Sequence, residues 1–220
     1  MHPGKLFLIP APIGNGEPES VIPQGTLDIL RTLRFFIVEE LRTARRYFVK
    51  AGLKTPVEEL TLSELNEHTR EEDIPALLQP VLEGNDAGLL SEAGAPAVAD
   101  PGSSLIALAH RRHIEVIPLV GPSSLLLALM ASGLNGQSFA FIGYLPVKSR
   151  ERQQRIRQLE NNSISGRQTQ LFIETPYRNH VLLNDLLTCC KPHTRLCLAA
   201  NITMPDAYIH TQTVAEWKKT

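Results

Sequence analysis

The chain has 220 residues, of which 43% are hydrophobic and 20% charged, and its net charge is −1. These proportions are typical of a globular protein, no apolar run reaches the ~18 residues of a membrane span, and the first segment lacks the charged leader and cleavage site of a signal peptide. The three cysteines, Cys189, Cys190 and Cys197, form no disulfide framework or zinc motif. We therefore expect a cytoplasmic protein without a metal site or membrane contact.

The charge is distributed unevenly along the chain. Residues 1–118 contain 11 Lys and Arg against 17 Asp and Glu, a net charge of −6, whereas residues 119–220 contain 11 against 6, a net charge of +5. This asymmetry suggests two units, the second facing a polyanion. With the boundary at the end of the last strand of the first unit, we expect domains at residues 1–119 and 120–220.

The front half alternates predicted strands and helices. Continuous apolar runs are typical of strands buried on both faces of a parallel sheet, and apolar residues at helical spacing predict the helices between them. The pattern therefore predicts an α/β domain with a doubly wound, mainly parallel sheet. Strands are expected at residues 5–10, 34–40, 88–90 and 115–120, a short strand or turn at 57–65, and helices at 23–33, at 71–82 and from 103 onward.

Loops rich in Gly, Ala and Pro follow three of these strands, at residues 11–16, 91–102 and 121–124. The first matches neither a P-loop nor GxGxxG and by itself is typical of a plain turn. The other two lie within about 35 residues of one another in a βαβ frame. Open α/β sheets bind ligands at the carboxyl ends of their strands, and small residues let a ligand approach the backbone, so these loops predict a ligand site.

Two carboxylates, Glu39 and Glu40, end the second predicted strand and precede Arg42. Charged groups at the carboxyl end of a strand are plausible site residues. Carboxylates are also favoured at the start of a helix by its dipole. Both interpretations stand on the sequence alone.

The back half predicts a second α/β domain. A helix at residues 123–133 is apolar almost all round and is therefore expected to be buried. The segment 148–159 has five Lys and Arg in ten positions and no aromatic residue between them; it is either a solvated helix face or a phosphate-binding surface. The other elements are strands at 139–145, 170–174, 195–200 and 208–211 and helices at 181–187 and from 213.

Common catalytic motifs are missing from the sequence. There is no nucleophile elbow, no HExxH, no glycine fingerprint for a dinucleotide and no acidic cluster typical of magnesium sites. What remains is a site built from backbone and small residues between two α/β units, with a basic flank. Such a site suits a cofactor or nucleotide bound mainly through main-chain contacts.

Five motifs occur in one order: PAPIGN (10–15), SEAGAPAVADPG (91–102), PLVGPSS (118–124), GYLPVKSRERQ (143–153) and ETPYR (174–178). Together they resemble the tetrapyrrole methylase, or class III methyltransferase, family. Within that family they are similar to the branch of 2′-O-methyltransferases of ribosomal small-subunit RNA, and the resemblance covers nearly the whole chain.

The resemblance implies two α/β domains, the second with a mixed sheet, and S-adenosylmethionine in a cleft between them, usually in a homodimer. It also implies that structured RNA is the substrate. The cofactor-binding residues that it implies are Pro12, Gly94, Ala95, Pro96, Ala97, Val98, Ser123, Ser124, Thr175, Ala199 and Ala200. The implied substrate-binding residues are Arg42, Asn66, Lys148, Arg150 and Arg178.

Methyl transfer is an in-line displacement that depends on alignment, and a ribose hydroxyl also benefits from a general base. Glu40, Glu92 and Glu174 are the candidates for this base, and the sequence does not rank them.

The chain departs from the pattern of the branch mainly on the side of the substrate. The family's EDTR is Glu-Glu-Leu-Arg at 39–42, its SDAGTP is SEAGAP at 91–96, and its DHNE-type segment is ELNE at 64–67. The strand expected to end in Ala-Arg-Glu-Leu-Thr ends in Ala-Ala-Asn-Ile-Thr at 199–203. A strand expected after Lys219 is absent, so the second domain is expected to lack its last strand.

The sequence alone leaves three functions open. The first is methylation of ribosomal small-subunit RNA. The second is methylation of a small molecule such as a tetrapyrrole, and the third is a regulatory role in which the cofactor site persists without catalysis.

Overall fold

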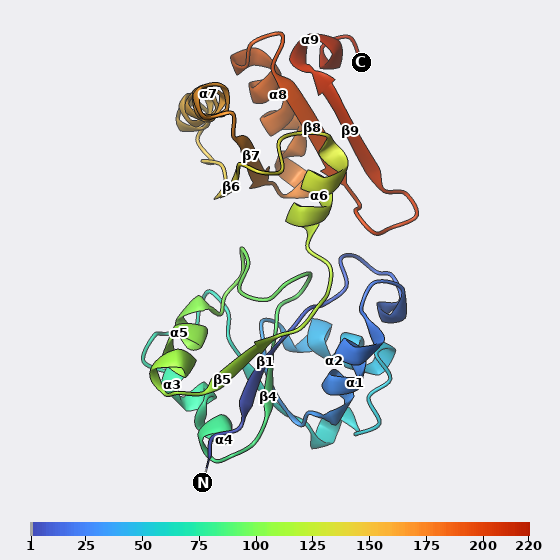
Figure 1. Ribbon diagram of the computed structural model, residues 1–220, viewed down its shortest axis with the longest axis vertical. Coiled ribbons are helices and arrows are strands. Elements are labelled where there is room, and N and C mark those ends of the chain that lie inside the picture. The colour runs from blue at the N-terminus through green and yellow to red at the C-terminus, as the bar shows by residue number, and fades with distance from the viewer. Residues whose placement is uncertain (1) are drawn as a thin grey trace. The chain divides into compact units, whose positions relative to one another are not determined.

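A computed structural model describes residues 2–220 (Figure 1). The chain divides into two compact units, Met1–Ser123 and Ser124–Thr220. They are called unit 1 and unit 2 below, and each is described by itself.

Unit 1 is built on a five-stranded sheet with the order β3-β2-β4-β1-β5, and every neighbouring pair is parallel. The apolar runs therefore predict the parallel sheet correctly. The ambiguous segment at residues 57–65 is a 3-10 helix followed by a strand. The strands are β1 (Lys5–Ile9), β2 (Phe35–Val38), β3 (Thr61–Glu64), β4 (Ala87–Leu90) and β5 (Glu115–Pro118).

The helices of unit 1 connect these strands. They are η1 (Pro18–Ser20), α1 (Gln24–Thr32), α2 (Leu41–Lys50), η2 (Val57–Glu59), α3 (Ile74–Leu77), α4 (Gln79–Leu82) and α5 (Ser103–Arg111). The single helix predicted at 71–82 is wrong, because two short helices occupy that segment. Pro75 and Pro80 each lie in the first turn of one of them, where a residue without an N–H is tolerated, whereas a proline inside one continuous helix would break it.

The sheet of unit 1 is covered on both faces, which is why its central strands β2 and β4 are apolar throughout. Helices α1 and α2 lie on one side of the strands and α3 and α5 on the other (Figure 1). On the first face, Phe36 packs against Phe48 of α2 with ring centroids 4.4 Å apart. On the second face, Leu6 and Leu89 lie in a cluster with Leu105 of α5. The two cores fix the positions of the strand ends.

Unit 2 contains two separate strand pairs. Strands β6 (Phe139–Tyr144) and β7 (Thr169–Ile173) are parallel, and β8 (Arg195–Ala200) and β9 (Tyr208–Thr213) are antiparallel. The helices are α6 (Ser124–Ser132), α7 (Ser149–Gly166), η3 (Pro176–Arg178), α8 (Asn179–Cys189) and α9 (Val214–Trp217). The second unit is thus also α/β, with strand pairs of both kinds.

The core of unit 2 joins α7 and α8. It contains Leu145, Ile156, Leu159, Leu182 and Leu186. The expectation that the apolar helix at 123–133 is buried is wrong in part. Leu129 of α6 is buried, but Leu126 and Met130 are 52% and 78% exposed.

Among residues 2–220, no helix combines the length and the apolar character needed to cross a membrane.

Candidate functional site

Two of the small-residue loops of unit 1 are joined directly by their backbones. Ala11 N–H donates to Gly94 O at 2.9 Å, and Gly94 N–H donates to Ala11 O at 3.0 Å. Ala11 follows β1 and Gly94 follows β4, and these strands are parallel neighbours. The loops predicted from the sequence therefore meet at one edge of the sheet.

The third loop reaches the same place. A Cβ atom on Gly121 would lie 2.2 Å from Pro10 Cγ, so only glycine allows this approach between the ends of β5 and β1. A Cβ atom on Gly94 would point between the other two loops, 3.6 Å from Pro122 O and 3.9 Å from Ile13 Cγ1. Gly94, which is buried, therefore lies where the three loops converge.

The loop after β4 has an unusual backbone. Gly94, Ala97 and Ala99 have φ angles of 71°, 62° and 68°. Left-handed conformations cost alanine about 1–2 kcal/mol each, and such strain gathers at ligand sites. Ala97 is half-buried and Val98 is exposed, so this loop offers both main chain and small side chains to a ligand.

The three loops converge where the connections after neighbouring strands go to opposite faces of the sheet. The chain leaves β1 toward α1 on one face, whereas it leaves the adjacent β4 toward α5 on the other face (Figure 1). Ligands of open α/β proteins bind in the crevice that such a reversal creates. The carboxyl ends of the neighbouring strands β1 and β4 are therefore the candidate binding site of unit 1.

A pocket next to these loops is rich in carboxylates. Its lining residues come from the ends of β1, β2 and β4 and from the first turns of α2: Ala11, Val38, Glu39, Glu40, Thr43, Ala44, Tyr47, Leu90, Ser91 and Glu92. Glu92 N–H donates to Glu39 Oε2 at 3.1 Å, and Thr43 Oγ1 donates to Glu92 Oε1 at 3.1 Å. These contacts connect the acidic ends of β2 and β4.

Glu40 caps helix α2. Its Oε2 accepts a hydrogen bond from Thr43 N–H at 2.6 Å. Backbone hydrogen bonds from Arg42 and Thr43 lower the pKa of Glu40, so it stays ionised and is a weak proton acceptor. Of the two sequence interpretations, the helix-start role is the one that its contacts support.

The pKa values of Glu39 and Asp100 are raised, whereas that of Glu40 is lowered. Burial raises the pKa of the Glu39 carboxyl, and repulsion from Asp100, Glu92 and Glu67 raises it further, against a backbone hydrogen bond from Glu92 that lowers it. Burial also raises the pKa of Asp100, against a hydrogen bond from Ser91. Asp100 is not among the site residues predicted from the sequence, and Glu39 is not among the predicted bases. The position of Glu39 at a strand end was the available signal.

Glu174 and Arg178 form an internal ion pair in unit 2. Glu174 Oε2 lies 2.8 Å from Arg178 Nη2, and both side chains are largely buried. Glu174 Oε1 accepts hydrogen bonds from Thr175 N–H at 2.8 Å and Thr175 Oγ1 at 3.3 Å. A carboxylate with these partners is poorly suited to act as a general base, and the Arg178 guanidinium is already neutralised.

The other predicted residues lie apart from the pocket or are used locally. Asn66 Oδ1 accepts from His68 N–H at 3.0 Å and so stabilises its own turn. Arg42, Lys148 and Arg150 are exposed. Ala199 and Ala200 are exposed at the end of β8, where they pair with Ile209 and Tyr208. Ser123 ends unit 1, and Ser124 begins α6.

Metal ligands do not gather in the part of the chain from residue 2 to residue 220, where no group of three or more His, Cys, Asp or Glu is placed to hold an ion.

The fold is that of known methyltransferases. The chain is similar to the crystal structure of uroporphyrin-III-C-methyltransferase from Thermus thermophilus, with a TM-score of 0.57, 21% identity and coverage of 97% of this chain and 86% of the other. No protein-family model matches the sequence.

Relatives of known name show to which family of methyltransferases the chain belongs. The chain is 32% identical over 212 residues to ribosomal RNA small subunit methyltransferase I of Vibrio cholerae, covering 96% of this chain and 69% of that protein. It is 31% identical over 216 residues to the protein of the same name from Pseudomonas aeruginosa, covering 98% and 72%. The chain belongs to the ribosomal RNA small subunit methyltransferase I family, and it is a methyltransferase of the class that uses S-adenosylmethionine.

Proposed function

We propose that this protein transfers a methyl group from S-adenosylmethionine to a ribose 2′-oxygen of ribosomal small-subunit RNA. The relatives named for methylation of that RNA support the substrate. The observation that supports the donor site is the pair of hydrogen bonds between Ala11 and Gly94. It joins the two loops at the carboxyl ends of β1 and β4, from which the chain continues to opposite faces of the sheet (Figure 1). An RNA substrate implies a cytoplasmic protein, and the family resemblance implies a homodimer.

The donor would be held mainly by main chain. Pro12 and the Gly94–Val98 loop present backbone groups and small side chains at the edge of unit 1. With residues 1–119 and 120–220 as the two domains, Ser123, Ser124, Thr175, Ala199 and Ala200 would complete the site. When bound, the donor supplies an electrophilic methyl group on a sulfonium, so the protein's contribution is alignment and removal of a proton.

Glu39 is the base that we assign. Of the candidates from the sequence, Glu40 caps a helix and Glu174 is paired with Arg178. Glu92 lies in the same pocket but is exposed. Glu39 is partly buried there, and its raised pKa makes its carboxylate a better proton acceptor than an ordinary one.

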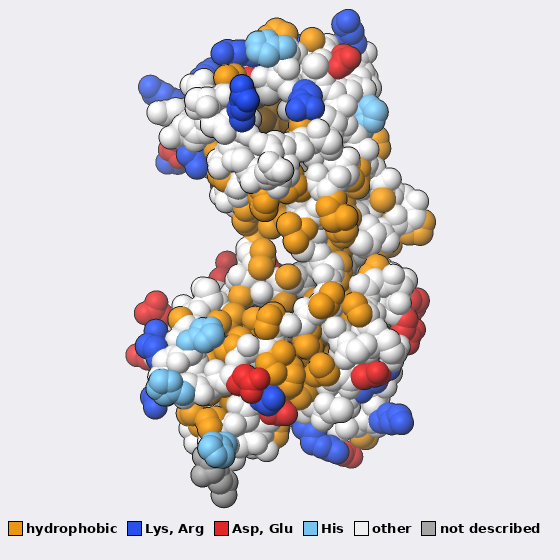
Figure 2. Space-filling view, in the orientation of Figure 1, with side chains coloured by type: hydrophobic (Ala, Val, Ile, Leu, Met, Phe, Trp, Pro, Cys, Tyr) orange, Lys and Arg blue, Asp and Glu red, His pale blue; other side chains and the backbone are white. Residues whose placement is uncertain are grey.

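The cations of unit 2 suit an RNA phosphate backbone. Lysine and arginine side chains gather over α7 (Figure 2), and Lys148 and Arg150 at its start are exposed. Arg152 in the same basic segment is buried and ion-paired, so the phosphate-binding interpretation applies to part of that segment. Arg42, exposed beside the pocket, would extend the cationic contacts in unit 1.

The test is methyl transfer from labelled S-adenosylmethionine to undermethylated small subunits, followed by mapping of the modified nucleotide. A labelled 2′-O-methyl ribose in the small-subunit RNA is expected. Label only on a base, or no label despite donor binding in calorimetry, would contradict the proposal.

A small-molecule substrate is the second candidate, because the fold is shared with an enzyme named for uroporphyrin-III methylation. Transfer to a tetrapyrrole, together with no affinity for RNA at low salt, would favour it. Donor binding without turnover on any substrate would favour the regulatory alternative.

A further inference from the structure

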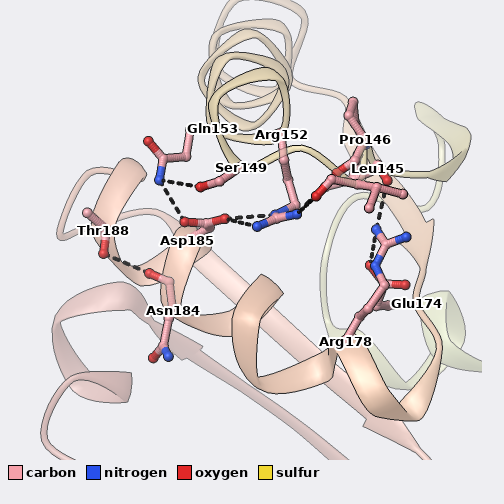
Figure 3. Close-up of polar contacts among 11 residues, drawn as sticks. Leu145, Pro146, Ser149, Arg152, Gln153, Glu174, Arg178, Asn184, Asp185 and Thr188 are labelled. Atoms are coloured by element: carbon pink, nitrogen blue, oxygen red, sulfur yellow. Dashed lines mark hydrogen bonds and ion pairs between the residues drawn. The ribbon is translucent and has the colours of Figure 1, made fainter.

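Three consecutive carbonyl groups in unit 2 accept hydrogen bonds from two arginines (Figure 3). Arg178 Nη2 donates to Leu145 O at 2.9 Å. Arg152 Nη1 donates to Pro146 O at 3.2 Å and to Val147 O at 2.6 Å. The Leu145–Val147 segment, which joins β6 to α7, is thereby fixed along its whole length.

Each of these arginines is neutralised by a carboxylate of unit 2. Arg152 Nε and Nη2 lie 2.7 and 2.6 Å from Asp185 Oδ2, and both side chains are almost fully buried. Gln153 Nε2 donates to Asp185 Oδ1 at 2.8 Å. Arg178 makes a single ion-pair contact with Glu174, from Nη2 to Oε2 at 2.8 Å. The two guanidinium groups therefore act on the backbone and are not left to bind phosphate.

The backbone at the end of β6 turns the side chain before this segment toward solvent. The pairing of β6 with β7 shifts register between Phe141 and Tyr144, and Gly143 between them has a φ of 76°. Bulges of this kind turn a side chain away from its regular direction, often beside active sites. Tyr144, directly before the fixed segment, is 55% exposed.

The side chains around the fixed carbonyls have the chemistry of an RNA contact. Val147 is 72% exposed and Tyr177, next to Arg178, is 83% exposed. Lys148 follows Val147 with an exposed side chain, whose Nζ lies 3.5 Å from the exposed carboxylate of Glu151, a surface ion pair of little net strength. Unstacked bases of single-stranded RNA stack on exposed aromatic rings, and lysines neutralise the phosphates between them. The aromatic residues that the basic segment lacks in sequence are thus supplied from the ends of β6 and η3.

We propose that Arg152 and Arg178 are positioning residues that fix the Leu145–Val147 segment, so that Tyr144, Val147 and Lys148 form a preformed surface for single-stranded RNA. This inference rests on the proposed function for its choice of ligand. Preorganisation removes the cost of ordering these groups when the RNA binds.

The test distinguishes loss of the hydrogen bonds from Arg152 to the Leu145–Val147 segment from a general loss of stability. Variants that remove these hydrogen bonds are called anchor variants. The double variant Arg152→Met, Asp185→Leu removes both buried charges together, which commonly leaves stability intact, but it releases Pro146 O and Val147 O. Arg152→Lys is the second variant, because an ammonium keeps the charge yet lacks the guanidinium fork that spans a carboxylate and two carbonyls. Arg167→Met, an exposed arginine at the other end of α7, is the matched control for charge.

Affinity for a fluorescent single-stranded RNA decamer and the KM for undermethylated small subunits are measured beside thermal unfolding and donor affinity. We expect both anchor variants to bind the decamer roughly tenfold more weakly and to raise KM more than they lower kcat, with donor affinity unchanged. Arg167→Met should stay close to the parent protein.

Equal RNA affinity in the folded anchor variants, or no RNA binding by the parent protein, overturns the inference. A protein that binds the decamer but methylates no RNA contradicts the proposed function and leaves the inference to be decided by the affinities. If the double variant does not fold, the comparison of Arg152→Lys with Arg167→Met decides it.

Discussion

Ala11 and Gly94 exchange two backbone hydrogen bonds, at 2.9 and 3.0 Å, across the carboxyl ends of β1 and β4. The two loops lead to helices on opposite faces of the sheet (Figure 1). These hydrogen bonds connect the two loops of the candidate donor site. A substitution that displaces one loop should therefore displace the other.

Gly121→Ala tests whether the three loops act together. The new Cβ atom would lie 2.2 Å from Pro10 Cγ, so the ends of β5 and β1 must separate. Overpacking of this kind costs about 1–3 kcal/mol. We expect a lower free energy of unfolding in urea and weaker donor binding in calorimetry. Gly136→Ala, where the Cβ meets no atom within 4 Å, is the control, and equal donor affinity in both variants would contradict the shared site.

Glu40→Gln should remove a pH-dependent stabilisation of α2. The folded pKa of Glu40 is lowered below 4.5 by hydrogen bonds from the backbone. Its stabilisation is therefore present above the unfolded pKa and is lost as pH falls through the folded pKa. The variant should melt at a lower temperature than the parent at pH 7, with the difference closing below pH 4.5. A difference that persists at low pH would show that charge is not its cause.

Glu39→Gln should have opposite effects on stability and activity. The folded pKa of Glu39 is raised above 4.5 by burial, so its ionisation at neutral pH works against folding. The amide should make the protein more stable at pH 7, and this gain should vanish as pH falls below 4.5, where the unfolded carboxyl is protonated too. Methyl transfer should fall strongly while donor affinity stays unchanged. Full activity in the variant would exclude Glu39 as the base.

Arg152→Ala and the double variant Arg152→Met, Asp185→Leu should differ widely in stability. The single change leaves Asp185 buried without its partner, which costs about 3–5 kcal/mol. The double change leaves no unpaired buried charge, so its loss in free energy of unfolding should be smaller and confined to the hydrogen bonds that Pro146 O, Val147 O and Gln153 lose. Equal losses in the two proteins would mean that packing, and not an unpaired charge, sets the cost.

Trp217 offers a probe of unit 2, because it is the only tryptophan in the sequence. Its Nε1 donates to Leu196 O at 2.9 Å, so its fluorescence reports on the β8–β9 end of that unit. If the donor contacts both units, a concentration of 100 Kd should stabilise by about 2.7 kcal/mol and raise the urea midpoint followed at Trp217. An unchanged midpoint at saturating donor would confine the donor to unit 1.

The sequence predicts the centre of the sheet of unit 1 well because β1, β2 and β4 are apolar runs. It leaves the polar segment of β3 ambiguous, and it predicts the loops because small residues follow the strands. It predicts side-chain roles less well. Arg152 looks like one more cation of a basic helix, and only folding brings it to Asp185. The pocket is similar: Glu39 meets Glu92 through a contact between β2 and β4 that no local pattern encodes.

The burial of α6 shows the same limit. Its composition predicts a helix correctly, but composition does not tell which surface covers the helix, and Met130 is exposed.

Methylation of ribosomal RNA at the β1–β4 loops is tested by transfer of a labelled methyl group from S-adenosylmethionine to undermethylated small ribosomal subunits, measured for the parent protein and Gly121→Ala. One 2′-O-methylated nucleotide in the small-subunit RNA is expected for the parent, and a reduced yield at the same nucleotide is expected for the variant. Donor binding by the parent without any methylated RNA would contradict this expectation.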